Sequence, residues 1–78
     1  MYNKIYFFET AIRKYHFVMN KFPNQLTDNE LSDLHNNLGA IFFQKNEYKK
    51  ASLEWKKALS LNKKNERAIK NLELLKKI

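Results

Sequence analysis

The 78-residue chain is predicted to adopt an all-α fold, an antiparallel stack of about four helices. Apolar residues recur every three or four positions along most of the chain, which is the spacing of an amphipathic helix. Around Pro23 the pattern stops, and a helix-capping motif follows directly. Short polar segments separate the remaining apolar stretches. These observations predict helices near residues 4–21, 28–44, 47–60 and 65–77.

The first helix is expected to span residues 4–21. It ends before Pro23, because proline lacks the amide that would continue the helix and disfavours helical geometry in the preceding residue. Ala11 and Val18 lie beside its apolar stripe. The stripe itself consists of Ile5, Phe8, Ile12, Tyr15, Met19 and Phe22.

The second helix is expected to begin at a capping box, with Thr27 or Asp28 as the cap and Glu30 three residues after Thr27. Its single glycine, Gly39, lies in mid-helix, where glycine costs about 1 kcal/mol relative to alanine. Close packing against a large side chain would offset this cost. We therefore expect Gly39 to admit the bulk of Trp55 from the third helix.

The third and fourth helices are expected over residues 47–60 and 65–77. A short polar connection precedes the third helix, and a polar turn at residues 62–65 precedes the fourth. The fourth helix is expected to act as a lid with a polar outer side. Its apolar residues are Ala68, Ile69, Leu72, Leu75 and Ile78, and the residues of the outer side are Lys70, Glu73, Lys76 and Lys77.

The residues between 32 and 63 resemble the signature of the tetratricopeptide repeat (TPR) family, a helix-turn-helix unit of about 34 residues. The matching residues are Leu38, Gly39, Phe42, Tyr48, Ala51, Trp55 and Ala58, whereas His35 and Lys63 depart from the signature. The resemblance implies a TPR-like superhelical stack in one domain. Residues 1–25 would be the second helix of a partial repeat, 26–64 a full repeat with a lengthened first helix, and 65–78 a capping helix.

The resemblance also implies a non-catalytic scaffold that binds a protein or peptide partner. In the family, a concave groove is lined by the first helices of successive repeats. The corresponding positions here are Asp33, Asn36, Ala40, Phe43 and Gln44. One subgroup holds a carboxylate at a peptide's C-terminus. Asn37, which we count as a sixth predicted groove residue, and Arg67 match two positions of that clamp, although Asn71 replaces a basic residue.

A second candidate interface is the aromatic face of the first helix, formed by Tyr2, Tyr6, Phe7 and Phe17. These side chains point away from the core stripe and are too many aromatic groups to leave in water. A preceding helix, a second copy of the chain or a partner protein would cover them. We predict a homodimer through this helix.

The net charge of +7 resides entirely in residues 45–78, because residues 1–44 hold four basic and four acidic groups. The lysines of the third helix, Lys49, Lys50, Lys56 and Lys57, are most simply its solvated outer face. The alternative is a basic surface that docks an acidic partner or nucleic acid. No aromatic residue interleaves with these lysines to stack on bases, which disfavours nucleic acid.

The sequence does not indicate an enzyme, a metal site or a cofactor site. It contains no cysteine, and neither His16 nor His35 has a carboxylate three or four residues away on its own helix. No glycine-rich phosphate loop is present. No apolar run approaches the roughly 18 residues of a membrane span, and the N-terminal residues do not resemble a signal peptide. We expect a soluble protein. The segment from Tyr15 to Pro23, followed by a helix with Leu38-Gly39 and by Trp55, is similar to repeat proteins of bacterial envelope assembly, which leaves the compartment open between cytoplasm and periplasm.

Overall fold

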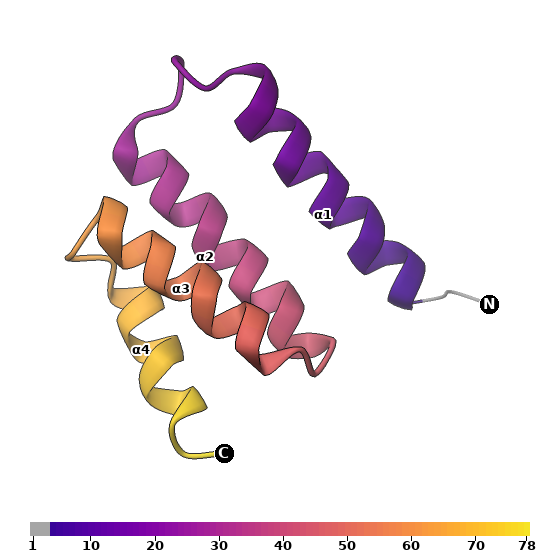
Figure 1. Cartoon of the computed structure of the whole chain (residues 1–78), viewed down its shortest axis with the longest axis vertical. Helices are drawn as coiled ribbons and strands as arrows, with labels where there is room; N and C mark the ends of the chain where they lie inside the picture. The colour runs from indigo at the N-terminus through magenta and orange to yellow at the C-terminus, as the bar shows by residue number, and fades with distance from the viewer. Residues whose placement is uncertain (1–3) are drawn as a thin grey trace.

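The computed structural model describes residues 4–78 and confirms the all-α fold (Figure 1). The bounds differ from the predicted ones by at most two residues. The helices are α1 (Lys4–Lys21), α2 (Asp28–Gln44), α3 (Tyr48–Leu61) and α4 (Glu66–Leu75).

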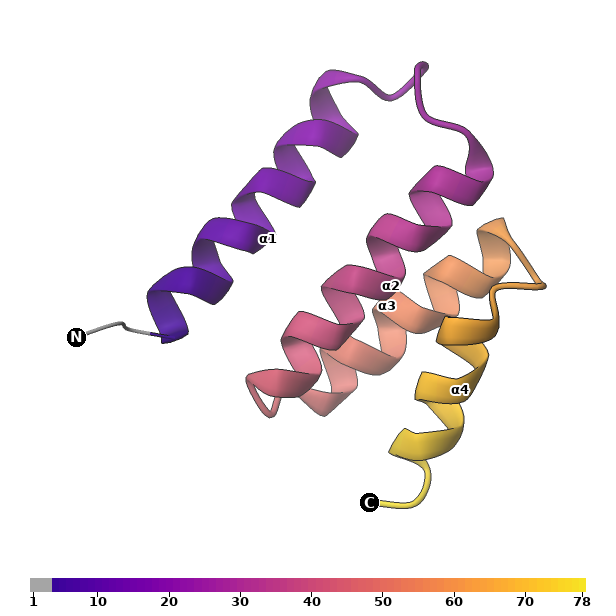
Figure 2. The ribbon, with the colours of Figure 1, turned by 180° about the vertical axis from the view of Figure 1, so that it is seen from behind.

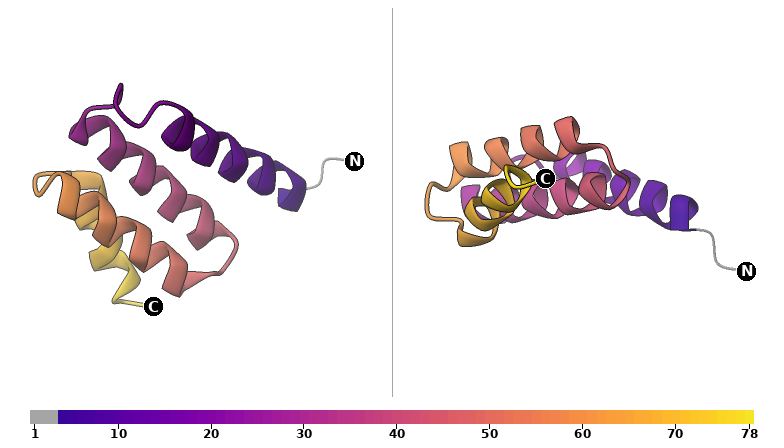
Figure 3. Two further views of the ribbon diagram at one scale, coloured as in Figure 1. Left: turned by 45° about the horizontal axis from the view of Figure 1, so that its top comes forward. Right: turned by 90° about the horizontal axis from the view of Figure 1, so that it is seen from below.

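The helices form a flat slab that measures 37 × 34 × 16 Å. Helix α1 lies at one edge and α4 at the other, with α2 and α3 between them (Figures 1 and 2). Figure 3 shows the same slab tilted on the left and edge-on, from below, on the right. Within the described part of the chain, α2 is the only helix that α1 contacts, whereas α2, α3 and α4 all contact one another. The core therefore lies on the α2–α4 side of the molecule.

Local hydrogen bonds explain where α2 begins. Thr27 is its cap: the Thr27 hydroxyl accepts a bond from the Glu30 amide at 3.1 Å, and the Thr27 amide donates to the Glu30 carboxylate at 2.9 Å. These reciprocal bonds are the predicted capping box. They also lower the pKa of Glu30, first through the bond from the Thr27 backbone.

The connection between α2 and α3 depends on a left-handed residue. Asn46 has a φ of 65°, a conformation that asparagine tolerates better than most residues that carry a side chain. The Tyr48 hydroxyl donates a bond of 3.0 Å to the side-chain oxygen of Asn46. The chain thus reverses direction within a few residues, and α3 runs antiparallel to α2.

The core is a seam between α2, α3 and α4. Trp55 is only 3% exposed, and Leu38, Ala51, Ala58 and Ala68 are fully buried. A β-carbon built on Gly39 would lie 2.6 Å from Cδ1 and 2.8 Å from Cε2 of Trp55, and nearer still to Nε1. The indole therefore occupies the space that the missing side chain of Gly39 leaves open, as the sequence predicted.

Two features differ from expectation. The exposed surface of α4 and the residues after it is not wholly polar, since Ile69 and Leu74 of the helix and Ile78 beyond its end are exposed. His35 has no carboxylate three or four residues away on its own helix, yet it is partly buried and its Nδ1 lies 2.8 Å from a carboxylate oxygen of Glu54 on α3. The carboxylate comes from a neighbouring helix, so spacing along a single helix could not reveal it.

Candidate functional site

A shallow hollow of about 130 Å³ opens between α2 and α4. Ala40, Phe43 and Gln44 enter it from α2, Trp55 from α3, and Asn71 and Leu74 from α4. The Phe43 and Trp55 rings lie 6.0 Å apart and give it an apolar base, while the Gln44 and Asn71 amides supply polar groups. Apolar surface combined with a few polar groups is a common feature of ligand-binding sites.

The structure brings together three of the six predicted groove residues, Ala40, Phe43 and Gln44. Asp33 is exposed near the start of α2, where it accepts a 3.4 Å bond from Asn65. Asn37 is half-buried and does not line the hollow.

The remaining predicted groove residue, Asn36, lies largely inside the protein with 5% of its surface exposed. Its side-chain oxygen accepts a 3.0 Å bond from Asn71, and its backbone carbonyl accepts a 3.1 Å bond from the Trp55 indole. Asn36 therefore joins α2 to both α3 and α4. Its oxygens hold the groove in shape and are already engaged within the protein.

A second polar cluster fixes the start of α4. The Asn65 amide nitrogen donates a 2.7 Å bond to the buried Ser32 hydroxyl, and that hydroxyl donates a 2.7 Å bond to the Ala58 carbonyl. The Asn65 side-chain oxygen caps α4 by accepting from the Ala68 amide at 3.2 Å. Sequence reasoning placed Asn65 in a polar turn but missed this role. The available signal was that Asn65 is an asparagine, a preferred N-cap residue, directly before the first residue of α4.

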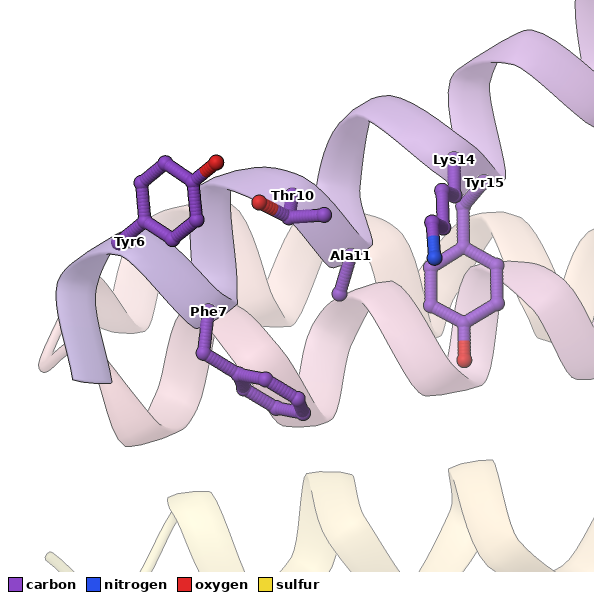
Figure 4. Close-up of a pocket in the computed structure, with 6 residues that line it drawn as sticks. All are labelled: Tyr6, Phe7, Thr10, Ala11, Lys14 and Tyr15. Atoms are coloured by element: carbon purple, nitrogen blue, oxygen red, sulfur yellow. The ribbon is translucent and has the colours of Figure 1, made fainter. Parts of the chain in front are cut away.

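The aromatic face of α1 carries two further hollows, of about 490 and 670 Å³. Tyr6 and Phe17 are 69% and 60% exposed, and Phe7 is half exposed, as expected for side chains pointing away from the core. Tyr2, the fourth predicted residue of this face, lies outside the described residues. Figure 4 shows the lining of the smaller hollow: Tyr6, Phe7, Thr10, Ala11, Lys14 and Tyr15.

An ion pair near this face ties the first turns of α1 to the end of α2. The Lys45 ammonium lies 2.6 Å from the Glu9 carboxylate and 3.3 Å from that of Glu47. The hydrogen bond with Lys45 lowers the pKa of Glu9, and the same bond raises the pKa of Lys45. The pair thus favours the charged form of both groups.

The outer face of α3 is basic, with one apolar side chain among the lysines. Leu53 is 58% exposed, and the neighbouring lysines of the helix are exposed as well: Lys49, Lys50, Lys56 and Lys57. Lys50 and Lys57 lie 3.7 Å and 3.2 Å from Glu47 and Glu54, so two of the four charges have acidic neighbours.

Among the described residues, no group of three or more histidine, aspartate or glutamate side chains is placed to hold a metal ion. No helix in residues 4–78 combines the length and hydropathy required to cross a bilayer.

No protein-family model matches the chain, and no curated protein or solved structure is significantly similar to it. A proposal about function must therefore rest on the residues and surfaces described above.

Proposed function

We propose that this chain is a non-catalytic scaffold of the TPR type that binds a protein or peptide partner. The observation that carries the proposal is the hollow between α2 and α4, which combines exposed apolar surface with amide groups. The close approach of Gly39 and Trp55 supports the TPR assignment, because both residues belong to the repeat signature. The exposed aromatic face of α1 is a second surface for binding a protein or peptide partner.

The groove is suited to an extended peptide. Gln44 and Asn71 can exchange hydrogen bonds with a peptide backbone, and Phe43 and Leu74 provide apolar contact for its side chains. Leu74 is 58% exposed, so it can gain buried area when a ligand arrives. Asn36 holds Asn71 in place beneath the ligand.

The test is a peptide-library selection against the whole chain, followed by binding measurements on purified variants. Leu74→Ser should weaken selected peptides by about tenfold, because the change removes apolar contact at the groove. Leu53→Ser is the matched control, since Leu53 is equally exposed at 58% but lies on the outer face of α3. The groove assignment is wrong if selected peptides bind the two variants equally well.

The second candidate function is docking of an acidic partner or nucleic acid on the basic face of α3. The observation that favours it is the exposed Leu53 among four lysines, which together offer charge and apolar contact. Such binding should weaken steeply as salt rises. It should also disappear when Lys49 and Lys56 are changed to glutamate, whereas groove binding should survive both treatments.

A further inference from the structure

The aromatic face of α1 has the ridge and grooves of a surface on which another helix packs. Tyr6, Thr10 and Lys14 are four residues apart and form a central ridge that borders both hollows. Beyond it, the smaller hollow is lined by Phe7, Ala11 and Tyr15, and the larger one by Arg13 and Phe17, while Val18 continues the ridge at the end of the larger hollow. A ridge with a groove on each side is the surface that receives the ridges of a second helix.

The dimensions also fit a helix. The two hollows share three lining residues and extend from Tyr6 to Val18, which corresponds to about 18 Å along α1. A partner helix of about 12 residues would cover this length. Apolar side chains at positions i, i+3, i+4 and i+7 of that helix would enter the hollows.

The charge on this face indicates which kind of helix fits. Arg13 and Lys14 line the hollows, and no carboxylate is among the described residues that line them. Lys21 lies 5.9 Å from the centre of the Phe17 ring, so it adds a third positive group. The single acidic residue of α1, Glu9, is engaged with Lys45.

These charges disfavour a second copy of the chain as the occupant. Arg13 and Lys14 lie near the middle of the two hollows, so face-to-face pairing of two α1 helices in either direction would bring them close to the same cations of the other copy. Each copy also carries a net charge of +7, which adds long-range repulsion. A helix with acidic residues beside its apolar stripe would meet the same cations with favourable charge.

We propose that the aromatic face of α1 docks an acidic amphipathic helix of a partner protein. The inference rests on the proposed binding function. It specifies the kind of ligand, at a surface separate from the α2–α4 groove. Apolar residues of the partner helix fill the two hollows, and its carboxylates lie near Arg13, Lys14 and Lys21.

The test uses two fluorescent peptides of about 18 residues, long enough to span the hollows. Both carry leucines at the i, i+3, i+4, i+7 spacing. One has glutamates flanking this stripe, and the other has lysines in their place. Fluorescence anisotropy with the whole chain should show the acidic peptide binding about tenfold or more tightly than the basic one, and less tightly as salt rises.

Three variants locate the binding. Phe17→Ser should weaken the acidic peptide about tenfold, because it removes an aromatic contact. Ile78→Ser should leave its affinity unchanged, although Ile78 is even more exposed than Phe17, 73% compared with 60%. Lys14→Glu should reduce the preference for the acidic peptide. Since all three side chains are exposed, circular dichroism and thermal melting should show a fold like that of the unchanged protein.

Other outcomes would overturn the proposal in distinguishable ways. If both peptides bind equally well and Phe17→Ser abolishes this binding, α1 is a docking face, but its partner need not be acidic and the proposal is wrong on that point. Absence of binding, or equal binding to Phe17→Ser, would remove docking at α1 without affecting the groove. Sedimentation that shows a dimer of the chain alone, dissociated by Phe17→Ser, would identify a second copy as the occupant.

Discussion

Gly39 and Trp55 show how one small residue determines the distance between two helices. Glycine in mid-helix lowers helix stability, yet here it makes room for an indole that is 3% exposed. The indole NH donates to the Asn36 carbonyl at 3.1 Å, so the ring is fixed in orientation as well as in position. The local cost at Gly39 is offset by burial and hydrogen bonding of Trp55.

The first prediction concerns Gly39→Ala. Alanine is the better helix former by about 1 kcal/mol, so α2 by itself would gain stability. The added methyl group would nevertheless overlap the Trp55 ring, at 2.6 Å from Cδ1, and such overpacking costs about 1–3 kcal/mol. We expect a net loss of up to about 2 kcal/mol in urea unfolding. The loss should be smaller in a Trp55→Phe background, and a gain in stability would contradict the packing described.

The second prediction concerns Asn65→Ala. The change removes the cap of α4 and the hydrogen bond to the buried Ser32 hydroxyl, with an expected loss of about 1–3 kcal/mol in thermal or urea unfolding. Asn62→Ala is the matched control from the same turn. It removes one exposed bond of 3.1 Å to the Lys64 amide and should cost less than about 1 kcal/mol. Equal losses would show that the Ser32 bond contributes little.

At the scale of whole elements, α1 differs from the other helices in how it is held. It packs on α2 alone within the described part of the chain, and the Glu9–Lys45 ion pair adds a polar tie near its N-terminal half. Glu9 is about half exposed, so solvent screens the pair. Because the pair depends on the charges of both groups, the attachment of α1 to α2 should depend on pH.

The third prediction is a pH dependence. The Lys45 hydrogen bond lowers the pKa of Glu9 from its ordinary value of 4.5 in the folded protein. The resulting stability is fully present above this value and is lost as pH falls through the lowered folded pKa. Glu9→Gln should lower the melting temperature near neutral pH and flatten its fall between about pH 6 and pH 3.

Glu73→Gln on α4 controls for the loss of one negative charge. Equal pH profiles for the Glu9 and Glu73 variants would contradict a stabilising role for the Glu9–Lys45 pair. The capping carboxylate of Glu30, whose pKa is also lowered, should leave a residual pH dependence in both variants.

The elements were largely predictable because their signals are local. The apolar spacing, Pro23 and the capping box at Thr27 fix helix bounds through interactions within a few residues. The Gly39–Trp55 contact was predictable because a costly mid-helix glycine implies a close neighbour. The bonds from Asn65 to Ser32 and from His35 to Glu54 join distant parts of the chain, and spacing along one helix carries no signal for them.

Across the whole molecule, packing is uneven. Trp55 and the buried alanines gather on the α2–α4 side, whereas α1 contributes no fully buried side chain among those described. Local opening follows the distribution of buried apolar contacts. Helix α1 should therefore separate from the slab more readily than α2 and α3 separate from each other.

The fourth prediction follows from this asymmetry. In native-state hydrogen exchange, amides in the middle of α1 should be protected at least about tenfold less than those in the middle of α3. The acidic helical peptide, if it docks on α1 as proposed, should raise the protection of α1. Equal protection of α1 and α3 in the free chain would show that the molecule opens as one unit.

The candidate surfaces were only partly predictable at this scale. Helical spacing correctly placed Tyr6, Phe7 and Phe17 on the exposed side of α1. It could not show that Asn36 is buried, because that depends on how α4 crosses α2. Helical spacing also did not assign Leu74 to the groove. The exposed residues of α4 were expected to be polar, and Leu74 was not among them.

The slab is only 16 Å thick, about the depth of two packed helices, so each residue holding it together lies close to a surface. A ligand at either edge that binds only the folded chain draws the folding equilibrium toward the native state. Occupancy at α1 would then improve affinity at the α2–α4 groove whenever the free chain is partly unfolded. Because both surfaces belong to one small folded unit, their shared dependence on folding makes the two sites cooperative, without any change in the shape of either.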